Sequence, residues 1–356
     1  GRRARYALYA QVAADEGAAI VALGHHRDDQ AETVLMHLLR GSGSGGLRGM
    51  QVLRDGMYLR PLLEISRAEI VAYARENDVP FREDASNADG RFLRNRVRGH
   101  LLPMLREYNP NVVDVLHRTA AILNGENDFV EAAAENALTA VLIKGCGGKL
   151  DLDVPRLVDY HIAVQRRVIR LVLGRLSDVP ADFALIDRIL QTLRERREGL
   201  LDVGRGLRIQ YWRDRLLLRQ GVAAPLALAV PLPGAVAIPE RGGHLSCRLM
   251  SAEDFGDIRS QLGHSLVALD ADKLGAHPLV RTARVGDRFQ PFGMRGKKKL
   301  SDFLIDLKYP RILRDEVLLL EGNGHIAWVV GMRCSEAFRI GPESRRIAVF
   351  EFRSSE

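Results

Sequence analysis

The sequence predicts an α/β fold that begins with a partial parallel sheet and continues into a helical region and a small α+β domain. The apolar run "AAIVALG" (residues 18–24) ends in glycine, which is typical of a strand buried on both faces of a parallel sheet. An amphipathic helical pattern from Asp28 to Arg40 follows directly. Such alternation of strand and helix indicates an α/β layer architecture. After the helical region, short strand-like segments dominate.

Each further element of the first part has a local reason. Residues 4–16 have helical periodicity, and "MYLRPLL" (57–63) is a short strand that a proline interrupts. Residues 66–79 begin with Ser66-x-x-Glu69, the pattern of a capping box, so we predict a helix there.

The rest of the chain divides by its periodicity. Residues from about 111 to 200 repeat at helical spacing, and a hairpin follows that turns at Arg213-Asp214. Four prolines between 222 and 243 predict a linker or edge strands, and residues 244–356 read as short strands with few helices. The predicted domains are 1–110, 111–221 and 222–356.

The composition restricts the class of protein. The chain has 356 residues, of which 46% are hydrophobic, so it can bury a sizeable core. No run reaches 18 apolar residues and no secretory signal pattern opens the chain, so we expect no membrane partner. The three cysteines are far apart and form no C-x-x-C pair, which is typical of a reducing cytoplasm.

The stretch "GHHRDDQAET" places His25, His26, Asp28, Asp29 and Glu32 directly after the first predicted strand. Ligands of open α/β sheets bind at this carboxyl edge. One aspartate would suffice to cap the following helix. The other histidine and carboxylate side chains therefore favour a polar active-site rim. A zinc site is a weaker interpretation because no HExxH pattern is present, whereas Mg²⁺ would need only one or two carboxylates together with phosphate oxygens.

The glycine-rich segment "RGSGSGGLRGM" (residues 40–50) follows that helix. It lacks the G-K-[ST] ending of a Walker A loop and does not lead from a strand into a helix. We therefore interpret it as a helix end with a mobile or tightly turned loop.

A second constellation lies in "SNADGRFLRNRVRGHLLP" (residues 86–103). The spacing of Arg91, Arg94 and Arg98 predicts that they share one helix face. This face is either a solvated basic stripe or a set of guanidinium groups that stabilise phosphate.

Positive charge gathers near the C-terminus. The whole chain has a net charge of +7. Residues 281–314 contain ten Lys or Arg residues and three acidic residues, so this segment alone has the same net charge. Runs of charge are usually only solvated, but a basic segment also suits nucleic-acid phosphates. We predict that three aromatic side chains pack within the protein instead of stacking on bases, namely Trp212, Trp328 and Phe292.

Taken together, these residues resemble the tRNA(Ile)-lysidine synthetase family. The resemblance rests on residues 24–50, 60–110, 287–320 and 326–333, and it covers most of the chain. It implies an ATP-pyrophosphatase-like (PP-loop) domain with a Rossmann-like sheet. Such a domain adenylates the C2 oxygen of the wobble cytidine in a CAU-anticodon isoleucine tRNA. Free lysine then displaces AMP and forms lysidine.

The resemblance also implies roles for single residues. Asp29, His25, Glu32 and Arg94 are predicted to be catalytic, and Asp29 is the predicted Mg²⁺ ligand. The predicted ATP-binding residues are His26, Asp28 and Arg98. Contacts to tRNA are predicted for a larger basic set, namely Arg91, Arg288, Arg295, Lys297, Lys298 and Lys299. Lysine is the expected second substrate, and a homodimer is the oligomer considered.

One part of the family's pattern is absent from the sequence. The Ser-Gly-Gly-x-Asp-Ser pyrophosphate loop should precede residue 1 by several tens of residues, so we expect an N-terminally truncated copy that is inactive by itself and has an exposed sheet edge. Two alternatives remain open at this point. One is a tRNA thiolation enzyme of the same superfamily, and the other is a non-catalytic tRNA-binding remnant.

Overall fold

The structure, a computed structural model, describes residues 2–81, 91–256 and 262–354. The chain divides into two compact units, residues 1–136 and 137–356. The division falls inside one long helix, α7 (Val112–Val141). The three domains predicted from sequence stay a prediction beside this division.

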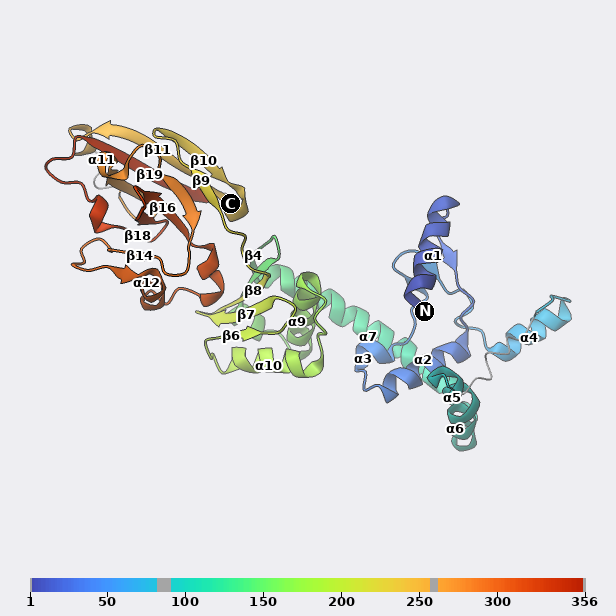
Figure 1. The fold of residues 1–356 in the computed structure, drawn as a ribbon. Coiled ribbons are helices and arrows are strands. Elements are labelled where there is room, and N and C mark those ends of the chain that lie inside the picture. The colour runs from blue at the N-terminus through green and yellow to red at the C-terminus, as the bar shows by residue number, and fades with distance from the viewer. Residues whose placement is uncertain (1, 82–90, 257–261, 355–356) are drawn as a thin grey trace. The chain divides into compact units, whose positions relative to one another are not determined.

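The first unit is mainly helical, with a small sheet beside α1 (Figure 1). Its elements before α7 are α1 (Arg2–Asp15), β1 (Val21–Ala22), α2 (Arg27–Leu39), α3 (Ser44–Leu47), β2 (Leu53–Arg54), β3 (Tyr58–Leu59), α4 (Arg67–Glu76), α5 (Leu93–Arg96), the π-helical segment η2 (Val97–Leu101) and α6 (Leu102–Tyr108). The predicted helices over 4–16, 28–40 and 66–79 are thus confirmed, and Ser66 and Glu69 form the predicted capping box.

The small sheet corrects one prediction. Its strand order is β1-β3-β2, with β1 parallel to β3 and β2 antiparallel to it. The strand predicted over 18–24 forms only at Val21–Ala22, and Ile20 is 46% exposed. Burial on both faces was therefore wrong for this strand. Val21 is only half-buried and Ala22 is exposed, so both faces of this two-residue strand are incompletely covered.

The core of the first unit holds α2 in place. Ala31 and Leu35 of α2 pack against Val97 of η2, Leu102 of α6 and Val113 of α7. These five side chains are all buried. Burial of such apolar surface stabilises by about 25 cal/mol per Å², so this contact fixes α2 against the helical segment that carries Arg94 and Arg98.

The second unit begins with a five-stranded antiparallel sheet of order β4-β5-β8-β7-β6. Its elements are β4 (Leu142–Cys146), β5 (Lys149–Asp153), α8 (Val154–Val158), α9 (Ile162–Leu176), α10 (Phe183–Arg194), β6 (Gly199–Asp202), β7 (Leu207–Trp212) and β8 (Arg215–Gln220). The hairpin β7–β8 turns at Arg213-Asp214, as predicted, and both residues have positive φ. The hairpin β4–β5 was not predicted, although Gly147-Gly148 is a hairpin-turn signal.

The remainder of the second unit has short strands and few helices, as predicted. They are β9 (Ala227–Ala229), β10 (Gly234–Ile238), η3 (Pro239–Arg241), β11 (Gly243–Ser251), β12 (Leu266–Asp270), α11 (Ala271–Leu274), β13 (Leu279–Thr282), β14 (Arg288–Phe289), β15 (Lys298–Lys299), α12 (Leu300–Asp306), η5 (Arg311–Glu316), β16 (Leu318–Gly322), β17 (His325–Val329), β18 (Arg333–Cys334), η6 (Glu336–Phe338) and β19 (Arg346–Ser354). Both β9 and β10 are edge strands, as the prolines predict.

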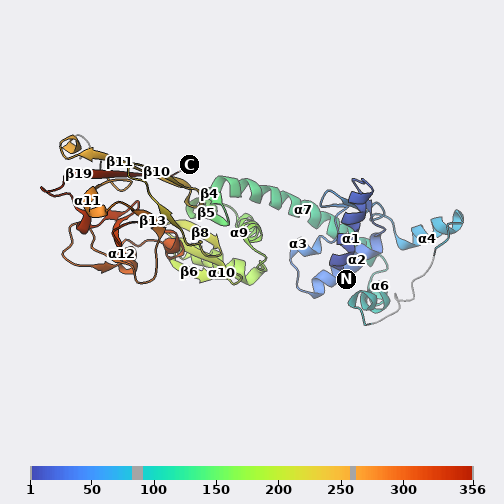
Figure 2. The same cartoon turned by 45° about the horizontal axis from the view of Figure 1, so that its top comes forward.

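Two sheets enclose the core of this C-terminal part. One has the order β10-β11-β19-β12, and the other has the order β18-β17-β16-β13-β9. Strands β11 and β19 lie side by side in both views (Figure 1, Figure 2). Trp328 of β17 and Phe350 of β19 are fully buried in the shared core, so the two sheets pack face to face. Of the described residues, no helix is long and apolar enough to cross a bilayer.

Candidate active site

Helix α2 begins directly after β1, and its first turn is built from the predicted polar residues. The residue that caps the helix is His26, whose Nδ1 accepts a hydrogen bond from the Asp29 amide at 3.3 Å. The Asp29 carboxylate accepts one from the His26 amide at 3.1 Å. The prediction that an aspartate caps the helix was therefore wrong, because Asp29 occupies the third position of this capping box instead.

Asp29 and Glu32 form a buried acidic pair on α2. Asp29 is 7% exposed and Glu32 is 1% exposed. Their spacing of three residues puts both carboxylates on one face of the helix. That face points toward the helical segment α5–η2, which supplies two guanidinium groups.

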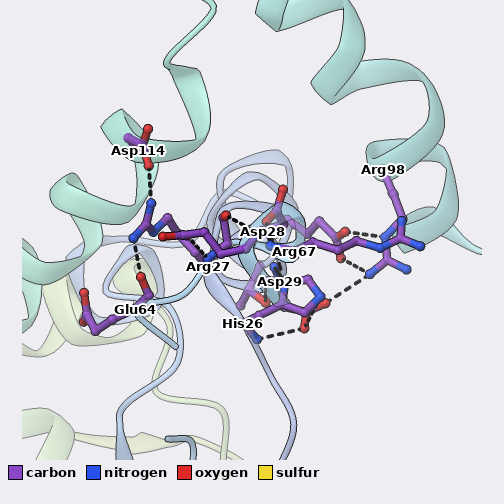
Figure 3. Close-up of polar contacts among 12 residues, drawn as sticks. His26, Arg27, Asp28, Asp29, Glu64, Arg67, Arg98 and Asp114 are labelled. Atoms are coloured by element: carbon purple, nitrogen blue, oxygen red, sulfur yellow. Dashed lines mark hydrogen bonds and ion pairs between the residues drawn. The ribbon is translucent and has the colours of Figure 1, made fainter. Parts of the chain in front are cut away.

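Arg94 and Arg98 bind both carboxylates. Arg94 donates to Glu32 at 2.6 Å and to Asp29 at 2.9 Å. Arg98 donates to Glu32 at 2.5 and 3.2 Å and to Asp29 at 3.0 Å. Figure 3 shows Arg98 reaching Asp29 from the neighbouring helix. Two positive and two negative charges thus form one hydrogen-bonded cluster.

The cluster is electrostatically balanced. The hydrogen bond to Glu32 raises the pKa of Arg98 above its ordinary value, although partial burial opposes this. Removing one partner from a buried pair leaves an uncompensated charge and costs about 3–5 kcal/mol. The fully buried Glu32 carboxylate therefore depends on its two arginines.

The predicted basic helix face is only partly formed. Arg94 lies on α5 and Arg98 in the π-helical segment, a kind of helix that occurs often at functional sites. Arg91 lies before the first residue of α5 and is exposed. Residues 86–90 of the motif lie outside the described residues.

Two neighbours of Asp29 connect α2 to other elements. Asp28 accepts a hydrogen bond from the Arg67 amide at 2.9 Å and lies 3.4 Å from the Arg106 guanidinium. Arg27 donates to Asp114 of α7 at 3.0 Å and to the carbonyl of Glu64. Figure 3 shows both connections. These contacts orient the start of α2 in the first unit.

A cavity of about 490 Å³ lies beside this cluster in the first unit. Its wall includes His25 and Arg94, but not Asp29, Glu32, His26, Asp28 or Arg98. Among the described residues, six arginines line it and no acidic residue does. The arginines are Arg5, Arg40, Arg48, Arg54, Arg60 and Arg94.

Most of these arginines were missed by the sequence reasoning. Arg48 has Asp128 at 3.5 Å and Arg54 has Asp55 at 3.0 Å, and both of these carboxylates are mainly exposed. Such exposed pairs offset charge only weakly. The cavity therefore keeps an excess of positive charge. No spacing links Arg5, Arg40 and Arg60 in the sequence, so only the fold brings them together.

The glycine-rich segment forms one wall of the cavity instead of a mobile loop. Gly45, Arg48, Gly49 and Met50 all line the cavity. His37 of α2 lies with Nδ1 2.5 Å from the Gly46 carbonyl oxygen. The segment therefore has definite partners, and part of it, Ser44–Leu47, is the helical turn α3 instead of the predicted loop.

The acidic pair does not offer a ready metal site in this arrangement. Both oxygens of Asp29 and both of Glu32 already accept hydrogen bonds. Of the described residues, no three His, Cys, Asp or Glu side chains form a group that could hold a metal ion. The arrangement thus does not fit Mg²⁺ as it stands, and Asp29 as a Mg²⁺ ligand stays a prediction.

Except for Arg91, which precedes α5 in the first unit, the predicted tRNA-contacting residues lie on the β14–β15 ribbon and its loop in the second unit. Arg288 pairs directly with Lys299 across the ribbon, and both are exposed. Like charges in this position destabilise a ribbon, so an anionic partner would relieve the repulsion. Arg295 and Lys297 are exposed too, whereas Lys298 is half-buried and forms an ion pair with Asp306.

The aromatic residues divide into two groups. Trp328 is fully buried, and Trp212 donates to the Lys308 carbonyl at 2.7 Å, so both pack within the protein as predicted. Phe292 is 44% exposed, and the Arg339 guanidinium lies 5.6 Å from its ring centre. Phe292 therefore lies outside the core, although its ring contacts a side chain of the protein. The reason is that the loop after β14 carries it away from the core.

Comparison with known proteins extends the resemblance over the chain. The PP-loop domain family matches residues 1–105, and the family described as TilS substrate C-terminal domain matches residues 279–349. A tRNA(Ile)-lysidine synthase from Symbiobacterium thermophilum is 38% identical over 95% of this chain and 74% of its own length. The corresponding protein of Geobacter sulfurreducens is 37% identical over 99% of this chain and 76% of its own. A crystal structure of a TilS C-terminal domain has 25% identity and a TM-score of 0.34, covering 37% of this chain and 99% of its own.

Proposed function

The chain belongs to the tRNA(Ile)-lysidine synthase family, and from this premise we propose how its residues share the reaction. The cytidine C2 oxygen attacks the α-phosphorus of ATP, and pyrophosphate leaves. The lysine ε-amine then attacks C2, the bond from C2 to oxygen breaks, and AMP leaves with that oxygen. The amine loses one proton, so the steps balance.

ATP is placed in the arginine-lined cavity in this proposal. A triphosphate carries several negative charges, and the cavity presents six arginines without an acidic residue among its described lining. A volume of about 490 Å³ lies in the range of small-molecule sites. Guanidinium groups bind phosphate oxygens in pairs and stabilise the charge that develops on a leaving pyrophosphate.

One observation carries the assignment of roles, namely that Arg94 belongs both to the cavity wall and to the acidic cluster. Its side chain is 37% exposed, so it is accessible to a phosphate. Asp29 and Glu32 do not line the cavity. We therefore assign Arg94 the contact with the reacting phosphate and treat both carboxylates as positioning residues that orient it. This replaces the direct catalytic role predicted for Asp29 and Glu32.

The nucleophile needs a proton acceptor. A lysine ε-ammonium must lose a proton before it attacks, and the carboxylates of the cluster are occupied by arginines. His25 lines the cavity at the carboxyl edge of the sheet. An imidazole titrates near neutral pH, so we assign it the acceptance of this proton.

The tRNA is contacted by the basic ribbon of the second unit in this proposal. Arg288, Arg295, Lys297 and Lys299 present exposed positive charge there. Contacts of this kind position a nucleic acid and do not read its sequence. Lysine as the second substrate and a homodimer also stay proposals, and sedimentation velocity would test the dimer.

Magnesium enters this proposal only with the nucleotide. Mg²⁺ commonly reaches such sites bound to phosphate oxygens, where it neutralises charge and orients the phosphates. Asp29 already holds Arg94, Arg98 and the His26 amide, so a metal ion at this carboxylate would compete with two guanidinium groups. The steps above therefore assign the phosphate contacts to arginines.

The direct experiment is nucleoside analysis by mass spectrometry. The protein, made from its complete reading frame, is incubated with isoleucine tRNA, ATP and lysine, and the digested tRNA is examined. We expect lysidine only when ATP and lysine are both present. A thiolated nucleoside that requires a sulfur donor would contradict the proposal, and unchanged tRNA that is nevertheless bound would support a non-catalytic role.

The cysteines already weigh against thiolation. Burial raises the pKa of the Cys247 thiol to about 12. Burial also raises the pKa of Cys334. Sulfur transfer relies on accessible thiolates of low pKa, and neither of these two described thiols has that character.

A further inference from the structure

Gln30 links the catalytic helix to the glycine-rich wall of the cavity. It follows Asp29 on α2 and is 4% exposed. Its Nε2 donates to the Met50 carbonyl at 3.0 Å, and its Oε1 accepts from the Met50 amide at 2.6 Å. One carboxamide thus satisfies both main-chain groups of a single residue twenty positions away.

The neighbouring glycine is shaped to this contact. Gly49 has φ +67, in the left-handed region that favours glycine. A Cβ atom added there would lie 2.6 Å from Oε1 and 2.8 Å from Nε2 of Gln30. The close approach therefore requires both a carboxamide at residue 30 and a glycine at residue 49.

The contact continues across the cavity. The chain passes from Met50 to Gln51, whose carbonyl accepts a hydrogen bond from Arg60 at 2.6 Å. Arg60 is 2% exposed and also donates to the Tyr6 hydroxyl of α1 at 3.3 Å. Gln30, Met50, Gln51, Arg60 and Tyr6 thus form a continuous frame, and the last four line the cavity.

We infer that Gln30 is a positioning residue that holds the glycine-rich segment as a fixed wall of the nucleotide cavity. The segment has other attachments, and His37 Nδ1, 2.5 Å from the Gly46 carbonyl oxygen, holds its helical turn α3. Arg48 lies 3.5 Å from Asp128, which is 61% exposed, and Ser44 lies 3.5 Å from Asn127. The exposed Arg48–Asp128 pair contributes little, and none of these three contacts involves Gly49 or Met50. The buried carboxamide is therefore the anchor of the Gly49–Met50 end of this segment.

The test compares Gln30→Ala with a matched control, Gln165→Ala. Gln165 is 5% exposed, and its carboxamide also holds main-chain groups, the carbonyls of Val158 and Tyr160, but it lies in the second unit. Both variants lose a buried carboxamide, so both should lower the melting temperature. Only Gln30→Ala should speed hydrogen exchange at the Met50 amide, by roughly tenfold or more.

A kinetic measurement, which rests on the proposed function, separates positioning from general damage. For lysidine formation by the protein from its complete reading frame, we expect Gln30→Ala to raise the KM for ATP about tenfold and to lower kcat by less than about threefold. Gln165→Ala should leave the KM for ATP unchanged. Gln30→Glu should behave like Gln30→Ala, because one carboxylate oxygen would face the Met50 carbonyl.

These experiments distinguish failure of the Gln30 inference from failure of the proposed function. A wild-type protein that forms no lysidine would refute that function, while hydrogen exchange would still test the anchor. Equal Met50 exchange in Gln30→Ala and Gln165→Ala would overturn the inference. If Gln30→Ala does not fold, Gly49→Ala tests the same contact, since the added methyl group displaces the carboxamide. Unchanged Met50 exchange in Gly49→Ala would overturn the inference too.

Discussion

At the scale of single residues, the neighbours on α2 have separate tasks. His26 caps the helix, Asp28 holds the start of α4, and Asp29 reaches across to Arg94 and Arg98. The side chains diverge because successive residues of a helix point about 100° apart. Residues that are adjacent in a polar motif thus need not belong to one site.

Replacing Asp29 by Asn tests the positioning role. The amide cannot pair electrostatically with two guanidinium groups, so Arg94 loses its orientation toward the cavity. We expect Asp29→Asn to lower the rate of lysidine formation by at least about 100-fold, which corresponds to about 2.7 kcal/mol. Binding of tRNA should change less than about twofold, because Asp29 lies outside the basic ribbon.

The matched control for Asp29 is Asp114→Asn. Asp114 also pairs with an arginine of α2, Arg27, but its carboxylate is 59% exposed. Exposed pairs contribute about 0–1 kcal/mol, so this variant should keep its activity within about twofold. A rate for Asp29→Asn within a fewfold of the wild type would show that the cluster is not part of the active site.

The two arginines of the cluster should differ in their effects. Arg94 lines the cavity, whereas Arg98 does not. Lysine keeps the charge but loses the paired guanidinium contacts. We expect Arg94→Lys to lower kcat at least about tenfold more than Arg98→Lys does, measured as lysidine formed at saturating ATP. Equal losses would place both arginines in a purely structural role.

At the scale of elements, the sequence predicted the longer helices better than the strands. Helix α2 and the capping box of α4 follow from local periodicity and capping chemistry. The poor burial of β1 does not, because the burial of a strand depends on the elements that pack over its two faces, and these are distant in sequence. The cavity wall was missed for the same reason, since Gln30 and Met50 meet through tertiary contacts.

The β14–β15 ribbon predicts different roles for two adjacent lysines. Lys299 is exposed opposite Arg288, whereas Lys298 is half-buried and its ammonium group is held in a direct contact with Asp306. Lys299→Ala should therefore weaken tRNA binding more than Lys298→Ala, as titration at several salt concentrations would show. Replacing Lys297, Lys298 and Lys299 together should also flatten the salt dependence, by about 0.9 in slope for each lost phosphate contact. Identical salt slopes for the wild type and the triple variant would argue against this interface.

At the scale of the whole molecule, the two compact units should unfold separately. They meet within a single helix, and each has its own buried core. Asp287, which directly precedes β14 of the basic ribbon, accepts hydrogen bonds from Arg281 at 2.8 and 2.9 Å. The Arg281 side chain is 5% exposed, so this is a buried pair in the second unit.

Asp287→Asn should therefore destabilise one unit only. Breaking a buried pair costs about 3–5 kcal/mol, so calorimetry should show one transition lowered by several degrees and the other unchanged. Burial alone would raise the pKa of Asp287, but its hydrogen bonds to Arg281 and to the Arg284 amide outweigh this and lower it. In the unfolded chain the pKa of an aspartate is about 3.9, and in the folded protein the pKa of Asp287 is lower. The ion pair therefore stabilises the folded protein fully above about pH 3.9, and this stabilisation is lost as the pH falls through the pKa of the folded state. If Asp287→Asn lost stability over the same acidic pH range as the wild type, the titration would belong to another group.

By itself, the sequence determined the features that depend on neighbouring residues or on sums over many residues. Helical periodicity, capping at Ser66, the Arg213-Asp214 turn and the basic excess around Arg288 depend on neighbouring residues or on sums of charge, and the motif residues already resembled one family of enzymes. Only the tertiary structure decided which charges meet. The cluster of Glu32 with Arg98 and the contact of Gln30 with Met50 join positions far apart in the chain, because the packing of α2 against η2, α6 and α7 brings those elements together.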